Sequence, residues 1–370
     1  MTSLDIKFMR LDRQYHSIKE DILNGIDNVL VSGQVLQSKH IDELEKKISK
    51  LNNTQYGVAV NSGTDALRLS LRACGVSPGD RVLTTPLSFV ASSSVIISLG
   101  ATPVYADVSE DMHVCSKTYI DIMRSQKIDA LILVHLYGRL YDYSDVIYEA
   151  NRLSIPIIED CAQAFGATSK HRTIGQNVSA VCLSFDPMKV MAAYGSGGMV
   201  LTNNDHIDSK IRLLRYHGRD GNSEYPEVGD NSQLSSVQAS ILLSKLIFHE
   251  EWTKKRIKIA KKYNDVVNKN KYFKVVDQGE GGHVFHKYVL LVEQNKRNEL
   301  RNYLTENGIG SAIHYSTPLH KIQYIEKIIG KINLPNAEAL CRMTLSLPIY
   351  AELTKTEVDH ICKVLMSFGN

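Results

Sequence analysis

The sequence predicts an α/β fold: a large domain with a mainly parallel, mixed sheet flanked by helices, and a smaller C-terminal α+β domain. The main observation is that short apolar runs alternate with helix-like segments between residues 57 and 202. Most of these runs are continuously apolar, which is typical of strands buried on both faces of a sheet. The length of 370 residues is too great for one small core and suits either two domains or one large domain with an appendage.

The first 50 residues or so are predicted to form two helices. Apolar side chains recur there at helical spacing in two sets, which are separated by a turn at Ser32-Gly33. The sets are Ile18, Ile22, Ile26 and Val29, and then Ile41, Leu44, Ile48 and Leu51.

The strands of the main sheet follow these helices. A β-rich run, a turn with glycine and the start of a helix occur in that order from residue 57. Helix-like segments, such as residues 141–150, lie between most of the later predicted strands. The predicted strands are 57–60, 81–85, 102–106, 130–135, 156–159, 180–185 and 198–202.

The pattern changes near residue 245, and we place the domain boundary near residue 248. The segment 249–263 reads as a long, basic, amphipathic helix that contains Trp252, the only tryptophan. A strand over 285–292, a helix over 296–307 and a closing helix over 356–366 complete the predicted second domain. The predicted division is therefore a large domain of residues 1–248 and a small domain of residues 249–370.

Composition restricts the classes of partner. A hydrophobic content of 43% and a charged content of 22% are ordinary for a globular protein, and a formal charge of +3 without a dense basic cluster gives no footprint for nucleic acid. No apolar run approaches the roughly 20 residues of a membrane helix. The cysteines are scattered without C-x-x-C spacing, so we predict neither disulfides nor a zinc site, and we expect a reducing cytoplasm and buried thiols at Cys161 and Cys182.

An acid and a lysine follow two apolar runs in this sequence. Asp160 follows the run Ile157-Ile158-Glu159, and Lys189 follows the run 180–185. Since open α/β sheets bind ligands outside the carboxyl ends of their strands, we expect both side chains at that edge. A lysine amine can form a Schiff base with pyridoxal 5′-phosphate while a carboxylate keeps the cofactor's pyridine nitrogen protonated. A helix cap by Asp160 and a surface lysine are the structural alternatives.

Other residues are candidates for holding the same cofactor. Ser62, Gly63 and Thr64 lie between a predicted strand and a helix, where backbone N–H groups can receive a phosphate, although plain helix caps look the same. Ser184, five residues before Lys189, could add a hydroxyl to this cradle. Gln163, three residues after Asp160, could hydrogen-bond the phenolic oxygen of the ring.

The remaining candidates carry weaker local signals. Each is an aromatic or histidine side chain in a predicted loop, where it could contact the cofactor ring or the substrate. Core packing is the alternative for the phenylalanine, and a structural or solvated role is the alternative for each histidine. These candidates are Phe89, His217, His314, Tyr315 and His320.

Together these segments resemble the DegT/DnrJ/EryC1 family of sugar aminotransferases, a branch of the fold-type I enzymes that use pyridoxal 5′-phosphate. The resemblance covers nearly the whole chain, and the segments are specific as an ordered set. The matching segments are 61–67, 86–91, 100–104, 159–167, 184–189, 195–202, 231–242 and 347–350.

The resemblance implies a role for each of these residues. Lys189 corresponds to the Schiff-base lysine, Asp160 to the pyridinium partner and Gln163 to the ligand of the ring oxygen. Phe89 occupies the position that stacks on the ring. The implied phosphate ligands are Gly63, Thr64 and Ser184, next to Ser62 in the same cradle.

The resemblance also implies partners. Asn231, which has no signal of its own, corresponds to an asparagine that reaches the phosphate of the other subunit, so we expect a homodimer with active sites at the interface. His314 and Tyr315 fall in a loop that often helps to hold the sugar. Two departures are Gln233, where many members have arginine, and Ser196, where many have an acid. Gln233 leaves open what would contact a substrate carboxylate or phosphate there.

The function implied is transfer of an amino group from L-glutamate to a nucleotide-linked keto-sugar. The turn around Ser196 favours C3 amination of a dTDP-3-keto-6-deoxyhexose, in amino-sugar biosynthesis for surface glycans. The alternatives are a C4 keto-sugar, a cyclitol ketone or dehydration chemistry, and a pyridoxal phosphate-binding regulator without turnover. Lys189 argues against the dehydrating branches, which have histidine at this position.

Overall fold

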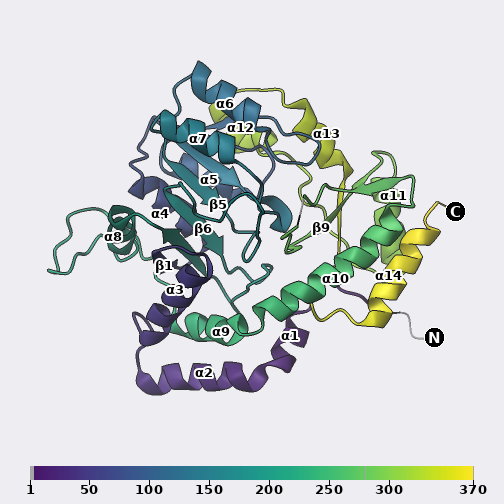
Figure 1. Cartoon of the computed structure of the whole chain (residues 1–370), viewed down its shortest axis with the longest axis horizontal. Coiled ribbons are helices and arrows are strands. Elements are labelled where there is room, and N and C mark those ends of the chain that lie inside the picture. The colour runs from purple at the N-terminus through teal and green to yellow at the C-terminus, as the bar shows by residue number, and fades with distance from the viewer. Residues whose placement is uncertain (1–3, 280, 370) are drawn as a thin grey trace.

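The structure is a computed structural model that describes residues 4–279 and 281–369. Within these residues the chain forms a seven-stranded sheet, here called the large sheet, and a three-stranded sheet, called the small sheet (Figure 1). Residues 1–3 and Asn370, which belong to the predicted large and small domains respectively, lie outside the described residues. Among the described residues, no helix is both long enough and apolar enough to cross a membrane.

The large sheet is mixed and mainly parallel, as the sequence predicts. Its strand order is β1-β7-β6-β5-β4-β2-β3, and β7 runs antiparallel to both of its neighbours while the other pairs are parallel. The strands are β1 (Tyr56–Val60), β2 (Arg81–Thr84), β3 (Thr102–Tyr105), β4 (Ala130–Val134), β5 (Ile157–Asp160), β6 (Ala180–Ser184) and β7 (Gly198–Thr202).

Helices surround this sheet (Figure 1). The predicted turn at Ser32-Gly33 is present, because Gly33 takes a left-handed conformation with φ 68° and ends α2. The helices before residue 248 are α1 (Leu11–Ser17), α2 (Lys19–Ser32), α3 (Lys39–Leu51), α4 (Gly63–Ala73), α5 (Ala91–Ser98), α6 (Ser116–Ser125), the 3₁₀ helix η1 (Leu136–Gly138), α7 (Ser144–Arg152), α8 (Asp205–Leu214) and α9 (Ser236–Leu246).

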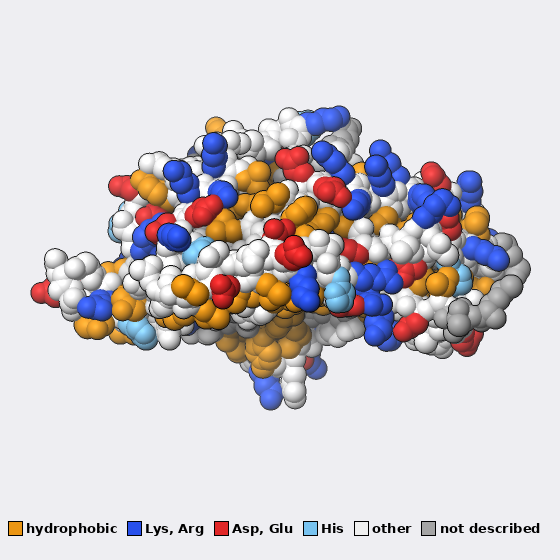
Figure 2. Space-filling model, turned by 90° about the horizontal axis from the view of Figure 1, so that it is seen from below, with side chains coloured by type: hydrophobic (Ala, Val, Ile, Leu, Met, Phe, Trp, Pro, Cys, Tyr) orange, Lys and Arg blue, Asp and Glu red, His pale blue; other side chains and the backbone are white. Residues whose placement is uncertain are grey.

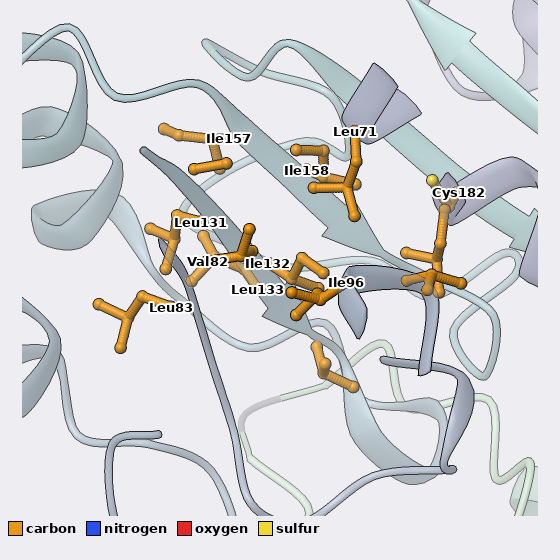
Figure 3. Close-up of a cluster of buried hydrophobic side chains, with 14 of the residues drawn as sticks. Leu71, Val82, Leu83, Ile96, Leu131, Ile132, Leu133, Ile157, Ile158 and Cys182 are labelled. Atoms are coloured by element: carbon orange, nitrogen blue, oxygen red, sulfur yellow. The ribbon is translucent and has the colours of Figure 1, made fainter. Parts of the chain in front are cut away.

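The central strands are buried on both faces, which explains their continuous apolar sequences. Val181 and Leu183 of β6 belong to the apolar cluster that includes residues of α3 and α9. Cys182, between them, points to the other face and lies 3.4 Å from Ser70 Oγ of α4. Figure 3 shows this second cluster, where Leu71 of α4 packs near Ile158 of β5. Alternate side chains therefore have an apolar environment on each side of the sheet.

The small sheet has the order β10-β9-β8 and lies after residue 248 in the sequence. The proposed division at residue 248 falls directly before α10, and it stays a prediction. The elements of this part are α10 (His249–Val267), β8 (Phe273–Val275), β9 (Tyr288–Val292), α11 (Arg297–Glu306), η2 (Leu319–Lys321), α12 (Gln323–Ile329), α13 (Pro335–Met343), β10 (Thr344–Leu347) and α14 (Lys355–Ser367).

One predicted strand is shorter than expected. The strand predicted over 285–292 begins only at Tyr288, because Phe285 has φ 51° and cannot continue an extended ladder. The Phe285 carbonyl accepts a hydrogen bond from Arg256 Nη1 at 3.1 Å instead of pairing within the sheet. As a result, residues 284–287 form a loop that runs along the segment 137–138.

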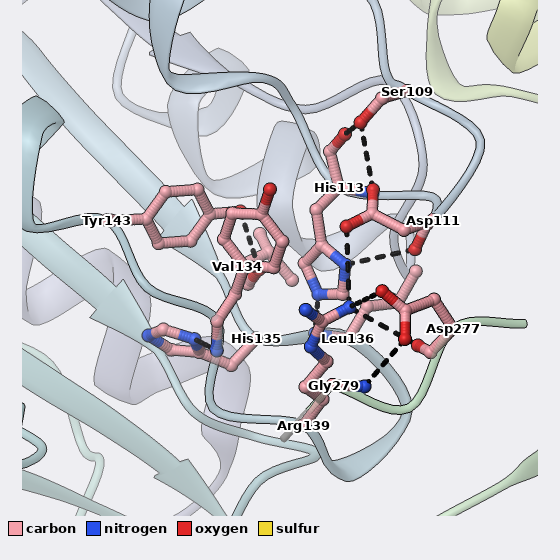
Figure 4. A network of polar contacts seen from close by, with 11 residues as sticks. Ser109, Asp111, His113, Val134, His135, Leu136, Arg139, Tyr143, Asp277 and Gly279 are labelled. Carbon is pink, nitrogen blue, oxygen red and sulfur yellow. Dashed lines mark hydrogen bonds and ion pairs between the residues drawn. The ribbon is translucent and has the colours of Figure 1, made fainter. Parts of the chain in front are cut away.

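A polar network joins the segment after β8 to the loops that follow β3 and β4 of the large sheet (Figure 4). Arg139 Nη1 lies 3.3 Å from Asp111 Oδ2 and 3.4 Å from Asp277 Oδ2, so one guanidinium bridges the loop after β3 and the segment after β8. His113 Nε2 accepts a 3.4 Å hydrogen bond from the backbone N–H of Leu136. These contacts hold the η1 segment, which reaches the candidate active site.

Candidate active site

The candidate site is a cavity of about 420 Å³ at the carboxyl ends of β1, β5 and β6. Since β7 is antiparallel to both β1 and β6, the latter two strands run in the same direction and end at the same edge. Predicted site residues from distant parts of the sequence meet there. Those that line the cavity are Ser62, Gly63, Thr64, Phe89, Asp160, Gln163, Ser184, Lys189, His314 and Tyr315.

Asp160 is the last residue of β5, and its carboxylate is held from two sides. Oδ1 accepts the backbone N–H of Ala162 at 3.1 Å, and Oδ2 accepts the hydroxyl of Ser92 at 3.1 Å. Burial raises the pKa of Asp160, although these hydrogen bonds and the charge of Lys189 oppose the shift. The carboxylate is therefore fixed in orientation and would be stabilised further by a buried cation.

Lys189 lies in the loop between β6 and β7. A turn positions it, because its backbone N–H donates to the carbonyl of Asp186 at 2.9 Å. Burial lowers the pKa of Lys189, while the charges of Asp160 and Asp186 counteract this effect only in part. A lowered pKa makes the uncharged, nucleophilic amine more accessible near neutral pH. The structure thus brings the predicted acid and lysine to one cavity.

A phosphate cradle is present at the start of α4. The hydroxyl of Ser62 caps the helix by accepting the backbone N–H of Asp65 at 3.0 Å, so the capping interpretation is correct for this residue. A Cβ on Gly63 would lie only 2.6 Å from Ser184 Cβ, and a Cβ on Gly198 would collide with the backbone of Ser62. The two glycines allow the helix start to approach β6 and β7 closely, which suits an anion bound by helix N–H groups.

Gln163 is held by hydrogen bonds at both ends of its amide. Oε1 accepts the backbone N–H of Tyr137 at 2.9 Å, and Nε2 donates to the hydroxyl of Tyr315 at 3.1 Å. The Tyr137 hydroxyl in turn donates to the carbonyl of His314 at 2.5 Å. This chain of contacts connects η1, the loop after β5 and the loop 314–315, and it leaves one Gln163 N–H for a ligand.

Three predicted site residues do not line this cavity. His217 and Asn231 are exposed outside it. His320 is fully buried, and its Nε2 lies 3.1 Å from Glu338 Oε1, so it has no surface left for a substrate. The structure therefore does not bring His217, His320 or Asn231 into the cavity of their own chain. Phe89 lines the cavity and remains 55% exposed, which leaves its face free to contact a ligand.

Sequence reasoning missed other residues that form the site. Ser92 fixes Asp160, and its position on α5 gives no local signal. His286 and Lys287 also line the cavity. The sequence does contain a signal for these two residues, because they are polar and interrupt the apolar segment 285–292. That segment is nevertheless predicted as a strand.

Glu159, next to Asp160, supports the site from the opposite side of β5. It is fully buried, accepts His135 Nε2 at 2.9 Å and pairs with Arg172. Although burial by itself raises the pKa of Glu159, the contacts with His135 and Arg172 lower it to about 2. This cluster anchors the end of β5 and therefore the position of Asp160.

Comparison with known proteins agrees with this geometry. The DegT/DnrJ/EryC1/StrS aminotransferase family model matches residues 16–366. The chain belongs to this family. Membership confirms the family that the sequence predicts, and it confirms the prediction of an aminotransferase.

Curated relatives of this chain cover it almost completely. A protein of Geobacillus stearothermophilus named pleiotropic regulatory protein is 32% identical, with 99% of each chain covered. The UDP-2-acetamido-2-deoxy-3-oxo-D-glucuronate aminotransferase of Pseudomonas aeruginosa is 32% identical, covering 97% of this chain and 99% of the relative. The dTDP-3-amino-3,4,6-trideoxy-alpha-D-glucose transaminase of Streptomyces venezuelae is 31% identical, with coverages of 95% and 93%.

Solved structures of the family have the same fold. DesV of S. venezuelae, in complex with a ketimine intermediate, has a TM-score of 0.93 at 30% identity, and 98% of each chain is covered. The PLP form of Spr1654 from Streptococcus pneumoniae has a TM-score of 0.87 at 25% identity, with 94% of this chain and 95% of that chain covered. These likenesses confirm the predicted fold class.

Proposed function

We propose that this chain transfers the amino group of L-glutamate to the keto group of a nucleotide-linked sugar. The observation that carries the proposal is that Asp160 and Lys189 line one cavity together with the cradle of Ser62, Gly63 and Thr64. Family membership and the PLP form of a family structure confirm pyridoxal 5′-phosphate as the cofactor. The residues of the cavity also fit it, since they offer a helix N-terminus, a buried carboxylate and a lysine.

Each of these residues has a task in the proposed reaction. When bound, the cofactor supplies an electron-withdrawing ring that stabilises negative charge on the carbon that loses or gains the amino group. Asp160 would keep the ring nitrogen protonated, and the Ser92 hydroxyl orients the Asp160 carboxylate. Lys189 Nζ would hold the cofactor, and its amine could move a proton to or from the reacting carbon. The Gln163 amide is oriented to donate to a ring oxygen.

We further propose amination at C3 of a dTDP-3-keto-6-deoxyhexose. Support comes from relatives whose names place the oxo or amino group at position 3, one on a dTDP-sugar and one on a UDP-sugar. The relative that acts on a UDP-sugar makes a UDP-linked 3-keto-sugar the alternative acceptor. A further candidate is a regulator, because one relative is named a pleiotropic regulatory protein. Lys189 and Asp160 in a cofactor-sized cavity favour turnover.

We propose that the protein acts as a homodimer with shared sites. Figure 2, seen from below, shows hydrophobic side chains among the charged ones on the side where Figure 1 places α2. Leu23, Leu30 and Val31 of α2 are exposed by 45%, 58% and 81%. Exposed apolar helix faces are common at subunit contacts. Asn231 is likewise exposed and free to reach a partner's cavity.

The experiment that tests the function is the absorption spectrum of the purified protein. A visible band that L-glutamate bleaches and one keto-sugar of a dTDP- and UDP-linked panel restores would support both half-reactions and identify the acceptor. Lys189→Ala is the control and should lack the band. A wild-type protein that binds pyridoxal 5′-phosphate without responding to L-glutamate would contradict the proposed donor, and no visible band even after the cofactor is added would contradict the role of Lys189.

A further inference from the structure

A second lysine lies at the candidate active site. Lys287 lines the cavity and is only 6% exposed. Its backbone is fixed, since its N–H donates to the carbonyl of Tyr137 at 3.2 Å and the N–H of Val284 donates to the carbonyl of Gly138 at 2.9 Å. The backbone that carries this lysine is therefore held by the same η1 segment that orients Gln163.

Within the described residues, the ammonium group of Lys287 makes neither an ion pair nor a hydrogen bond. Three other buried cations have oxygen partners: Arg172 pairs with Glu159, Arg256 donates to the carbonyls of Phe285 and Ile349, and Lys245 donates to the carbonyl of Ala192 at 2.7 Å. Lys287 has only the ring of Phe8, 5.0 Å from its Nζ. A buried cation without an anion is costly, so a site for an anionic ligand explains it well.

The two histidines that share the cavity with Lys287 offer it no negative charge. His286 and His314 also line the cavity, and the buried Nδ1 of His286 has no hydrogen-bond partner. Burial lowers the pKa of His314 to about 3, with the charges of Lys287 and Lys189 adding to this effect. Burial likewise lowers the pKa of Lys287 to about 7, and an anion would restore its charge.

We propose that Lys287 binds the α-carboxylate of the amino donor, a specificity role that rests on the proposed function. In an amino acid this carboxylate is attached to the carbon that reacts, so a cation that recognises it must lie near Lys189. Lys287 and Lys189 both line the same cavity, and the charge of Lys189 adds to the lowering of the pKa of Lys287. The diphosphate of a sugar nucleotide, by contrast, is separated from ring position 3 by ring carbons.

The test compares Lys287→Met, Lys287→Arg and a matched control, Lys245→Met. Lys245 is a fully buried lysine whose pKa is likewise lowered by burial to about 7, but it does not line the cavity. The rate at which L-glutamate bleaches the cofactor band gives the donor half-reaction, and 4-aminobutyrate serves as a donor without an α-carboxylate. Calorimetry with glutarate, a dicarboxylate that cannot react, gives binding apart from activity.

We expect Lys287→Met to lower the preference for L-glutamate over 4-aminobutyrate roughly 10- to 100-fold, the worth of a charge-assisted hydrogen bond. Glutarate should bind more weakly by a similar factor, Lys287→Arg should recover part of both losses, and Lys245→Met should change neither. The cofactor band and the melting temperature show whether each variant is folded. If Lys287→Met does not fold, Lys287→Gln is measured in its place.

Other results would overturn the assignment. One is an unchanged donor preference in a folded Lys287→Met protein. Another is a defect confined to the keto-sugar half-reaction, which would indicate that Lys287 binds the acceptor and not the amino donor. A wild-type protein that holds the cofactor but does not respond to L-glutamate overturns the proposed function and this assignment with it, whereas a normal wild-type response with an unaffected variant overturns this assignment alone.

Discussion

Asp160 and Lys189 show how burial prepares single side chains for their proposed roles. Burial raises the pKa of the acid and lowers the pKa of the amine, and each charge partly counteracts the shift of the other. The Ala162 N–H and the Ser92 hydroxyl keep the carboxylate pointing in one direction without neutralising it. An acid held this way is suited to stabilise a protonated ring nitrogen.

The Asp160→Asn substitution tests this role. The amide has nearly the same shape but no charge, so the cofactor should still bind while its ring nitrogen loses the proton. We expect the transamination rate to fall roughly 100- to 1000-fold, as when one electrostatic contact to a transition state is removed. The measurement is the single-turnover rate with L-glutamate, and unchanged kinetics would contradict the assignment.

Ser92→Ala should give a smaller loss of the transamination rate than Asp160→Asn, because it removes only one of two contacts to the Asp160 carboxylate.

At the scale of elements, the site depends on how closely α4 approaches the ends of β6 and β7. Gly63 begins α4 and Ser184 ends β6, and these two residues are in contact. The approach brings the N-terminal N–H groups of α4 to the cavity, where their partial positive charge suits a phosphate. Any side chain at position 63 must push the two elements apart.

Gly63→Ala should therefore weaken cofactor binding. Its Cβ would lie 2.6 Å from Ser184 Cβ, and overpacking of this kind costs about 1–3 kcal/mol. We expect a lower melting temperature and a larger dissociation constant for pyridoxal 5′-phosphate, measured by absorbance titration. Gly221→Ala is the control, since a Cβ there meets nothing within 4 Å. Equal behaviour of the two variants would show that the close approach does not matter.

The whole molecule determines whether the site is complete in one chain. The cavity of the single chain contains the predicted residues apart from Asn231, His217 and His320. Asn231 lies on the outside and pairs with Tyr216 through an isolated bridge. Its predicted contact with the phosphate is thus possible only across a subunit contact.

Mixing two inactive variants tests the shared site. In a dimer of Lys189→Ala and Asn231→Ala chains, one cavity combines an intact lysine with an intact partner asparagine. We expect activity in the mixture, up to about one quarter of the wild-type value if random exchange gives half heterodimers with one intact site of two. Activity after co-expression and tandem-tag purification is the measurement. If the activity of the mixture is no higher than that of either single variant, the result would count against an active site shared between subunits.

Buried lysines also affect the stability of the whole molecule. Burial lowers the pKa of Lys245 to about 7, whereas an unfolded lysine has a pKa of about 10.4. Between these values the unfolded chain binds more protons, so the free energy of unfolding rises with pH by up to about 1.4 kcal/mol per pH unit from this residue. The penalty is complete below pH 7 and absent above roughly pH 10.4.

The variant Lys245→Met should remove this contribution. We expect the free energy of unfolding to rise less steeply from pH 7 to pH 10 than in the wild-type protein. Urea unfolding at a series of pH values measures the difference in slope, which does not depend on the absolute stability of the variant. Parallel pH profiles would show that Lys245 remains fully charged in the folded protein.

The sequence predicted much of the fold because local patterns report burial. The apolar runs correspond to strands of the large sheet, since a strand covered on both faces, such as β6, leaves no position for polar residues. The strand predicted over 285–292 was too long because Phe285 has a positive φ, and its carbonyl accepts a hydrogen bond from Arg256, a tertiary contact that the local sequence does not report.

The sequence by itself determined the family, the cofactor and the residues most central to the proposed chemistry. Asp160 ends a strand, and Gly63 and Lys189 lie a few residues after strands, so all three are marked by strand ends, which are local signals. Only the tertiary structure decided which side chains share the cavity: it brought in Ser92 and Lys287 and left out His217 and His320. The physical reason is that a contact between loops depends on strand order and packing, and these bring together residues more than 100 positions apart.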